Sequence, residues 1–80
     1  MSVVHRVTGY DKQSERLECE KDIPPELVLY ARGLADAEPD YQAAPGAFPL
    51  NDVAVRRMSG VLGYDMNPDR YDWFLEPFET

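Results

Sequence analysis

The sequence has little cysteine and histidine, the residue types that form disulfides, metal sites and many reactive centres. It contains one cysteine, Cys19, and one histidine, His5. A single cysteine excludes an intramolecular disulfide, and one histidine without a cysteine or second histidine beside it is a weak basis for a metal site. Glutamates flank Cys19, and their charge opposes the thiolate that nucleophilic catalysis requires. The sequence therefore predicts a protein without metal or cofactor, and one that is not an enzyme.

Long apolar runs are also missing. The segment from Met1 to Arg6 is not an apolar stretch of signal-peptide length, and no stretch is long enough to span a bilayer. We therefore expect a cytoplasmic protein. Its 80 residues have the size of one small domain, residues 1–80. Without a disulfide or a structural metal ion, a core of that size contributes only about 3–5 kcal/mol to the stability of the fold.

Basic residues are scarce: eight Lys and Arg stand against fifteen Asp and Glu, for a net charge of −7. The excess is uneven, with −1 over residues 1–34 and −6 over residues 35–80. Such a field repels nucleic acid and anionic membranes and speeds the encounter with a basic protein. We expect neither nucleic acid nor membrane as a partner. Solubility alone is the simpler explanation of the charge.

The first twenty-two residues have the pattern of a β-hairpin. Val3–Thr8 is rich in β-branched residues, Gly9–Ser14 has turn composition, and Arg16–Lys21 alternates polar with apolar side chains. Because alternate side chains of a strand point to opposite faces, the pattern predicts two faces of different polarity. The expected dry face holds Val3, Val7, Leu17 and Cys19, and the expected wet face holds Arg6, Thr8, Glu18 and Glu20.

Two helices are expected after the hairpin. The first begins at the prolines after Asp22, which can cap it, and ends near Ala35; its apolar stripe is Leu27, Tyr30, Ala31 and Leu34. The second begins after Asn51, a good N-cap, and ends at Gly63; its apolar face holds Val55, Met58 and Leu62. Residues 36–49 form a long connection between the two helices. The side chains of Tyr41 and Phe48 are expected to pack against the rest of the domain and hold this connection in place.

A last strand is expected over Tyr71–Glu76, with Pro77 ending its ladder or confining it to an edge. The predicted fold class is α+β: a three-stranded sheet with two helices packed on one face, in the order β-β-α-α-β. The pattern leaves two placements of the last strand open. It lies either antiparallel beside the second strand or parallel beside the first.

Four oxygen-bearing residues have the spacing of a calcium-binding loop: Asp65, Asn67, Asp69 and Glu76. Arg70 stands where the sharp turn of that loop needs glycine, and a strand follows where a helix is required. The sequence therefore favours an Asp/Asn/Pro turn that leads into the last strand.

Phe74 is the clearest candidate for a contact residue. Trp73 and Phe74 are adjacent on a strand, so they face opposite sides, and Phe74 is the one expected among Asp72 and Glu76. An exposed aromatic ring surrounded by acids is typical of a binding hot spot. Cover of that face by residues 36–49 is an equally good explanation. The candidate partner-binding residues are Asp65, Asp69, Asp72, Phe74 and Glu76.

Three segments carry a resemblance: Val7-x-Gly9-Tyr10-Asp11-x-x-Ser14-x-x-Leu17-x-x-Glu20, Phe48-Pro49-Leu50 and Tyr71-Asp72-Trp73-Phe74-Leu75-Glu76. They resemble a group of short, uncharacterised bacterial proteins with a G-Y/F-D turn after the first strand and a Y-D-Y-F-L-E-like strand at the end. Trp73 replaces the tyrosine of that pattern. The group implies no activity or ligand, but its size and acidity are similar to those of bacterial immunity proteins.

The expected function is that of a non-enzymatic protein-binding module. In its sharpest form it is an immunity or antitoxin-type inhibitor that occupies a basic site on a partner protein, such as a nucleic-acid-cleaving toxin. The alternative is a small structural or regulatory domain that forms a homodimer through its sheet edges or Phe74.

Overall fold

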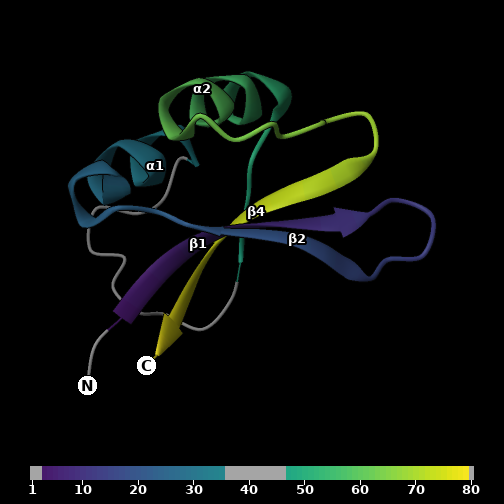
Figure 1. Cartoon of the computed structure of the whole chain (residues 1–80), viewed down its shortest axis with the longest axis horizontal. Helices are drawn as coiled ribbons and strands as arrows, with labels where there is room; N and C mark the ends of the chain where they lie inside the picture. The colour runs from purple at the N-terminus through teal and green to yellow at the C-terminus, as the bar shows by residue number, and fades with distance from the viewer. Residues whose placement is uncertain (1–2, 36–46, 80) are drawn as a thin grey trace.

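The computed structural model describes residues 3–35 and 47–79. Strands β1 (Val3–Asp11) and β2 (Leu17–Asp22) form the hairpin, and a single 3₁₀ turn, η1 (Pro25–Leu27), leads into helix α1 (Val28–Leu34). A two-residue strand, β3 (Phe48–Pro49), precedes helix α2 (Asp52–Leu62), and strand β4 (Tyr71–Glu79) ends the described chain. Both helices lie on the same side of the sheet (Figure 1). The α+β class and the shared helix face are as predicted.

The sheet has four strands in the order β2-β1-β4-β3, and every neighbouring pair is antiparallel. The prediction of three strands was therefore wrong, because β3 pairs with β4 through Phe48 and Pro49. Both predicted placements of the last strand were also wrong, since β4 lies antiparallel beside β1. Side chains of β1 are buried on both faces, as a central strand requires, whereas the acidic β2 is suited to an edge.

The helix-side face of the sheet carries the core. Val7 and Leu75 are fully buried there, and Trp73 is 2% exposed. Its indole nitrogen donates to the carbonyl oxygen of Asn67 at 3.0 Å, so the one polar atom of the ring is satisfied. The helices and connections complete the cluster with Ile23, Ala31, Ala35, Leu50, Ala54, Val55, Met58 and Met66.

A register shift in the hairpin changes the predicted faces. Gly9 pairs with Cys19 but Tyr10 pairs with Leu17, so Glu18 is an extra residue and the alternation breaks there. Leu17 consequently faces away from the helices and is 45% exposed, against the prediction of a dry-face residue. Val3, at the strand end, is also exposed.

Thr8 is more buried than predicted: its side chain is fully buried, although it lies on the face that was expected to be exposed to solvent. Arg6 does share that face with Glu20, at 3.9 Å, and binds Asp22 more closely, at 2.7 Å. Asp22 is thus used by Arg6. The turn before α1 has Pro24 at its N-cap and no side-chain cap, so the predicted capping role of Asp22 was wrong.

The second helix is as predicted at both ends. Asn51 Oδ1 accepts from the backbone N–H of Ala54 at 2.8 Å, and Gly63 ends the helix in the left-handed conformation with φ of 61°. Val55 and Met58 are buried and Leu62 is half-buried, as expected. In the first helix Ala31 is buried, but Tyr30, which was predicted to belong to the same apolar stripe, is 39% exposed.

Strand β4 continues through Pro77 to Glu79, so of the two roles predicted for Pro77 the end of the ladder was wrong. The edge position holds locally, because at Pro77 the strand pairs with β1, whereas β3 pairs with Phe74 and Leu75. The carbonyl of His5, the partner of Pro77, accepts from Ile23 on the β2 side at 2.8 Å. The His5–Pro77 pair is therefore one that exchanges no backbone hydrogen bonds, and the missing N–H removes nothing from the β1–β4 ladder. Within residues 3–35 and 47–79, neither helix has the length and apolar character needed to cross a membrane.

Candidate functional site

The candidate site lies on the open face of the sheet, the face opposite the helices. Alternation along β4 brings Asp72, Phe74 and Glu76 to this face. The register pairs them with Tyr10, Thr8 and Arg6 of β1, respectively. Three of the five predicted contact residues thus lie together. Asp65 and Asp69 are exposed in the connection between α2 and β4.

Glu76 is bound within the protein. The Thr8 hydroxyl donates to Glu76 Oε2 in a short contact, and the Tyr10 hydroxyl donates to the same oxygen at 3.1 Å. The buried Thr8 hydroxyl therefore has a charged acceptor, which removes the penalty of an unsatisfied polar group. Burial, followed by the hydrogen bond to Glu76 and its charge, raises the pKa of Tyr10. Glu76 acts in this arrangement by holding Tyr10 in place.

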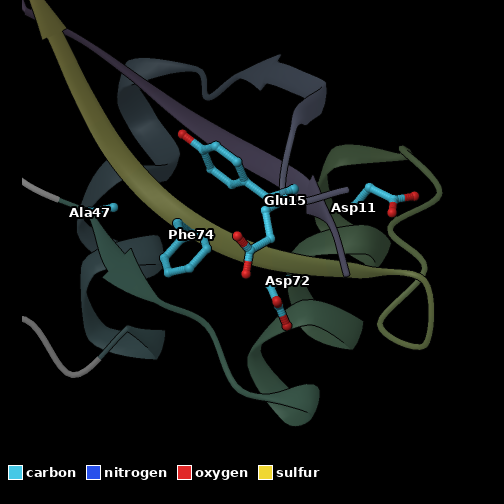
Figure 2. Close-up of a pocket in the computed structure, with 6 residues that line it drawn as sticks. Asp11, Glu15, Ala47, Asp72 and Phe74 are labelled. Atoms are coloured by element: carbon cyan, nitrogen blue, oxygen red, sulfur yellow. The ribbon is translucent and has the colours of Figure 1, made fainter. Parts of the chain in front are cut away.

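Tyr10 and Phe74 form an aromatic pair beside a pocket of about 290 Å³. Their ring centroids are 5.6 Å apart, and the rings are nearly perpendicular at 82°, which is the favourable edge-to-face arrangement. Phe74 is only partly buried. The described lining consists of Tyr10, Asp11, Glu15, Ala47, Asp72 and Phe74 (Figure 2).

Phe74 is covered in part by the connection that was predicted to lie over this face. Ala47 borders the pocket and Pro49 of β3 pairs with Phe74, so part of the 36–49 connection does lie beside this ring. The expected contact of Tyr41 lies outside the described residues. Phe74 is nevertheless only partly buried, and it lines the pocket (Figure 2).

Three carboxylates of the described residues border the pocket, and they differ in how they are bound. Asp11 accepts from the backbone N–H groups of Ser14 and Gln13 at 2.9 and 2.8 Å, and these bonds lower the pKa of its carboxyl group. Its other oxygen lies 3.8 Å from Arg70. Asp11 is therefore a structural residue of the hairpin turn.

The other two carboxylates are more available. Asp72 has one cationic neighbour, the exposed Lys12, at 3.5 Å. Glu15 is exposed, and no hydrogen bond or ion pair of its carboxylate occurs within the described chain. In Figure 2 the carboxylate of Glu15 lies beside Phe74, whereas those of Asp72 and Asp11 point away from the ring.

Glu15 also has an unusual backbone. Its φ of 61° makes it the one non-glycine residue with positive φ in the described segments. A side chain there clashes with the following carbonyl oxygen, so glycine or asparagine is the usual residue. The turn thus keeps a glutamate at a position where a smaller residue would be less strained.

The segment with calcium-loop spacing is a turn, as predicted. Asn67 Oδ1 accepts from the backbone N–H groups of Asp69 and Arg70 at 2.9 and 3.3 Å, and β4 begins at the next residue. Glu76 is used by Thr8 and Tyr10. Among the described residues, no three acidic, histidine or cysteine side chains converge on one point.

No family model, curated protein or solved structure matches this chain. Its function is therefore inferred from the geometry and charge of the open face of the sheet.

Proposed function

We propose that this protein is a non-enzymatic protein-binding module that contacts its partner through the open face of the sheet. The observation that supports the proposal is the accessible Tyr10–Phe74 pair with carboxylates at its border. A partly exposed aromatic pair surrounded by charge is the usual composition of a binding hot spot and its polar rim. The helix-side face, by contrast, is filled by the core of the protein.

The partner that fits this face is a basic protein. The chain carries a net charge of −7, and Asp72 and Glu15 add local negative charge beside the rings. Complementary charge raises the rate of encounter and selects against acidic partners, and salt screens this effect. The sharpest form of the proposal is an immunity-type inhibitor, because the active site of a nucleic-acid-cleaving toxin is basic and an acidic domain can block it.

The five candidate residues have different parts in this proposal. Phe74 and Asp72 contact the partner, and Glu76 holds Tyr10 from within the sheet. Asp65 and Asp69, exposed in the turn before β4, contribute charge at the rim. Rim charges change the rate of association more than they change the lifetime of a complex.

Site-specific photo-crosslinking in a lysate of the native host tests the proposal. A benzophenone amino acid replaces Gln13, which is exposed in the hairpin turn, or Arg57, which is exposed on α2, as the matched control. We expect a basic protein to be linked from position 13 and not from position 57. The yield is expected to fall steeply as salt rises from about 50 mM to about 500 mM. Equal yields from the two positions, or a yield that ignores salt, would contradict the proposal.

The immunity form has its own test. The linked protein, identified by mass spectrometry and purified, is expected to cleave RNA or DNA, and a stoichiometric amount of this protein is expected to stop the cleavage. A toxin-like reading frame adjacent to the gene would agree with this result. A linked partner without nuclease activity would contradict the immunity form and leave the binding module in place.

A further inference from the structure

We propose that the pocket beside Phe74 receives an arginine side chain of the partner. This inference rests on the proposed function and adds the chemistry of the group that is recognised. The pocket, at about 290 Å³, lies between the hairpin turn and β4, and both aromatic and acidic side chains border it. An arginine side chain has an apolar stem and a planar cation, and this lining suits both parts.

The same face of the sheet already holds one arginine in this way. The guanidinium carbon of Arg6 lies 4.8 Å from the ring centroid of Phe78. Two carboxylates hold its nitrogens, Asp22 at 2.7 Å and Glu20 at 3.9 Å. One aromatic ring and two carboxylates are thus sufficient to position a guanidinium on this sheet. Arg70, over the ring of Tyr71 at 5.3 Å, is a second example of arginine on an aromatic ring.

Phe74 supplies an aromatic ring like that of Phe78, but no guanidinium of the described chain lies over it. It lies four residues before Phe78 on β4, so the two rings belong to the same face. Within the described segments no Lys or Arg lies over Phe74, and its one aromatic partner there is Tyr10, which meets it edge to face. A guanidinium over such a ring is attracted by the negative charge of the π face.

Glu15 and Asp72 supply two carboxylates, as Asp22 and Glu20 do for Arg6. Both residues border the pocket, and Figure 2 shows the carboxylate of Glu15 beside Phe74. Glu15 has no cationic partner in the described chain, and Asp72 has only the exposed Lys12 at 3.5 Å. Arginine suits two carboxylates and a ring better than lysine does, because its five N–H groups lie in one plane that also stacks on aromatics.

An NMR titration with small probes tests the proposal on the protein alone. The probe is N-acetyl-arginine amide, and N-acetyl-citrulline amide, which has the same shape and no charge, is the control. We expect arginine to cause saturable shifts at residues 10–15, 47 and 72–74, and citrulline to cause none. Shifts spread over the whole acidic surface, equal shifts with citrulline, or tighter binding of N-acetyl-lysine amide would overturn the proposal.

Matched variants separate the pocket from the general field of the protein. Glu15→Gln removes one charge at the pocket and Phe74→Leu removes the ring while keeping apolar bulk. Each is expected to weaken arginine binding roughly two- to five-fold, as for other exposed pairs of this kind. Glu26→Gln removes one charge from the exposed turn before α1 and is expected to leave binding unchanged. Equal losses in Glu15→Gln and Glu26→Gln would show a field effect and overturn the proposal.

The two proposals fail separately. A crosslinked basic partner with no arginine binding at the pocket would retain the binding module and remove the arginine site. Arginine binding at the pocket with no crosslink from position 13 would retain the affinity of the pocket for a guanidinium and remove the partner as the source of that arginine.

Discussion

At the scale of single residues, Glu15 combines a backbone conformation that favours glycine with a long, exposed, charged side chain. A residue with φ of 61° is strained, and no hydrogen bond or ion pair of the Glu15 carboxylate within the described chain compensates for that strain. Strain of this kind at an exposed turn is consistent with a side chain retained for binding. Replacement of Glu15 by glycine should therefore relieve the backbone strain and weaken binding of the partner.

Glu15→Gly is expected to be more stable than Glu15→Ala by about 0.5–1 kcal/mol, because only glycine adopts this φ without a clash. The comparison with alanine cancels the loss of the glutamate side chain. Urea unfolding of both variants measures the difference. Both should lose arginine binding like Glu15→Gln. A glycine variant less stable than the alanine variant would show that the turn does not hold Glu15 in the left-handed region.

Tyr10 has a role that depends on pH. Burial first, and then the hydrogen bond to Glu76 and its charge, raise its pKa above the ordinary value of 10.0, so the folded protein holds the phenol proton more tightly than the unfolded chain does. This contribution to stability is present below pH 10.0 and is lost as pH rises through the folded pKa. The pKa values of Tyr64 and Tyr71 are also raised, with burial the largest cause in each, and they act in the same direction.

Tyr10→Phe is accordingly expected to lose less of its free energy of unfolding between about pH 9 and about pH 11 than the unchanged protein does. A part of the loss remains, because Tyr64 and Tyr71 still ionise. Urea unfolding across this range measures the slope. Tyr30→Phe, which removes the hydroxyl of a 39%-exposed ring on α1, is the control. A slope in Tyr10→Phe as steep as in the unchanged protein would contradict the role of the Tyr10–Glu76 contact.

At the scale of elements, the paired strands β1 and β4 approach each other most tightly at one glycine. Gly9 pairs with Trp73, and a Cβ at Gly9 would lie 2.9 Å from two carbon atoms of the indole ring. The indole cannot move away easily, because its nitrogen binds the Asn67 carbonyl at 3.0 Å and Tyr64 and Tyr71 pack edge to face against it. The absence of a side chain at Gly9 is what leaves room for the indole ring against β1.

Gly9→Ala is therefore expected to destabilise the protein by about 1–3 kcal/mol through overpacking. Tryptophan fluorescence should shift to the red as the indole is displaced toward solvent, and thermal unfolding measures the loss. Gly60→Ala is the control, because a Cβ at Gly60 in α2 meets no atom within 4 Å and alanine favours a helix. Gly9→Ala with the stability and emission of the unchanged protein would contradict this packing.

Elements with strong local signals were predictable, and those that depend on partners far along the chain were not. The Asn51 cap and the Gly63 terminus define α2 locally, and both were predicted from the sequence. The shift that turned Leu17 outward depends on how β2 meets β1, and the pattern of β2 alone is one of unbroken alternation. Strand β3 was missed because it has only two residues, one of them Pro49, and exists through its pairing with β4.

At the scale of the whole molecule, the strand order explains what could be predicted of the candidate site. Asp72, Phe74 and Glu76 follow from alternation along one strand. Tyr10 and Glu15 belong to a hairpin about sixty residues earlier, and only the unpredicted β1–β4 pairing brings them to Phe74. The turn residues near Gly9 carry ordinary turn composition, so no local signal marks Glu15 as part of a pocket.

The sheet edges of the molecule bear on the alternative function, a homodimer. The β2 edge is acidic, with Glu18, Glu20 and Asp22 along six residues. An antiparallel β2 pair between two copies centred on Glu20 would place like charges opposite each other, which is destabilising. The opposite edge, β3, has two residues, and Pro49 among them lacks an N–H to donate. Both edges are thus poor templates for a second copy.

We therefore expect the protein to sediment as a monomer of 9.1 kDa at micromolar concentration. Glu18→Thr with Glu20→Thr removes the central charges of the β2 edge while keeping the 2.7 Å Arg6–Asp22 contact, and this variant is expected to self-associate as concentration rises. Glu26→Thr, which removes an acid outside the sheet, should stay monomeric. Sedimentation equilibrium on the three proteins decides between charge at the edge and overall charge. A dimer of the unchanged protein would favour the homodimer, and disruption of that dimer by Phe74→Leu would place its interface on the open face instead of the edge.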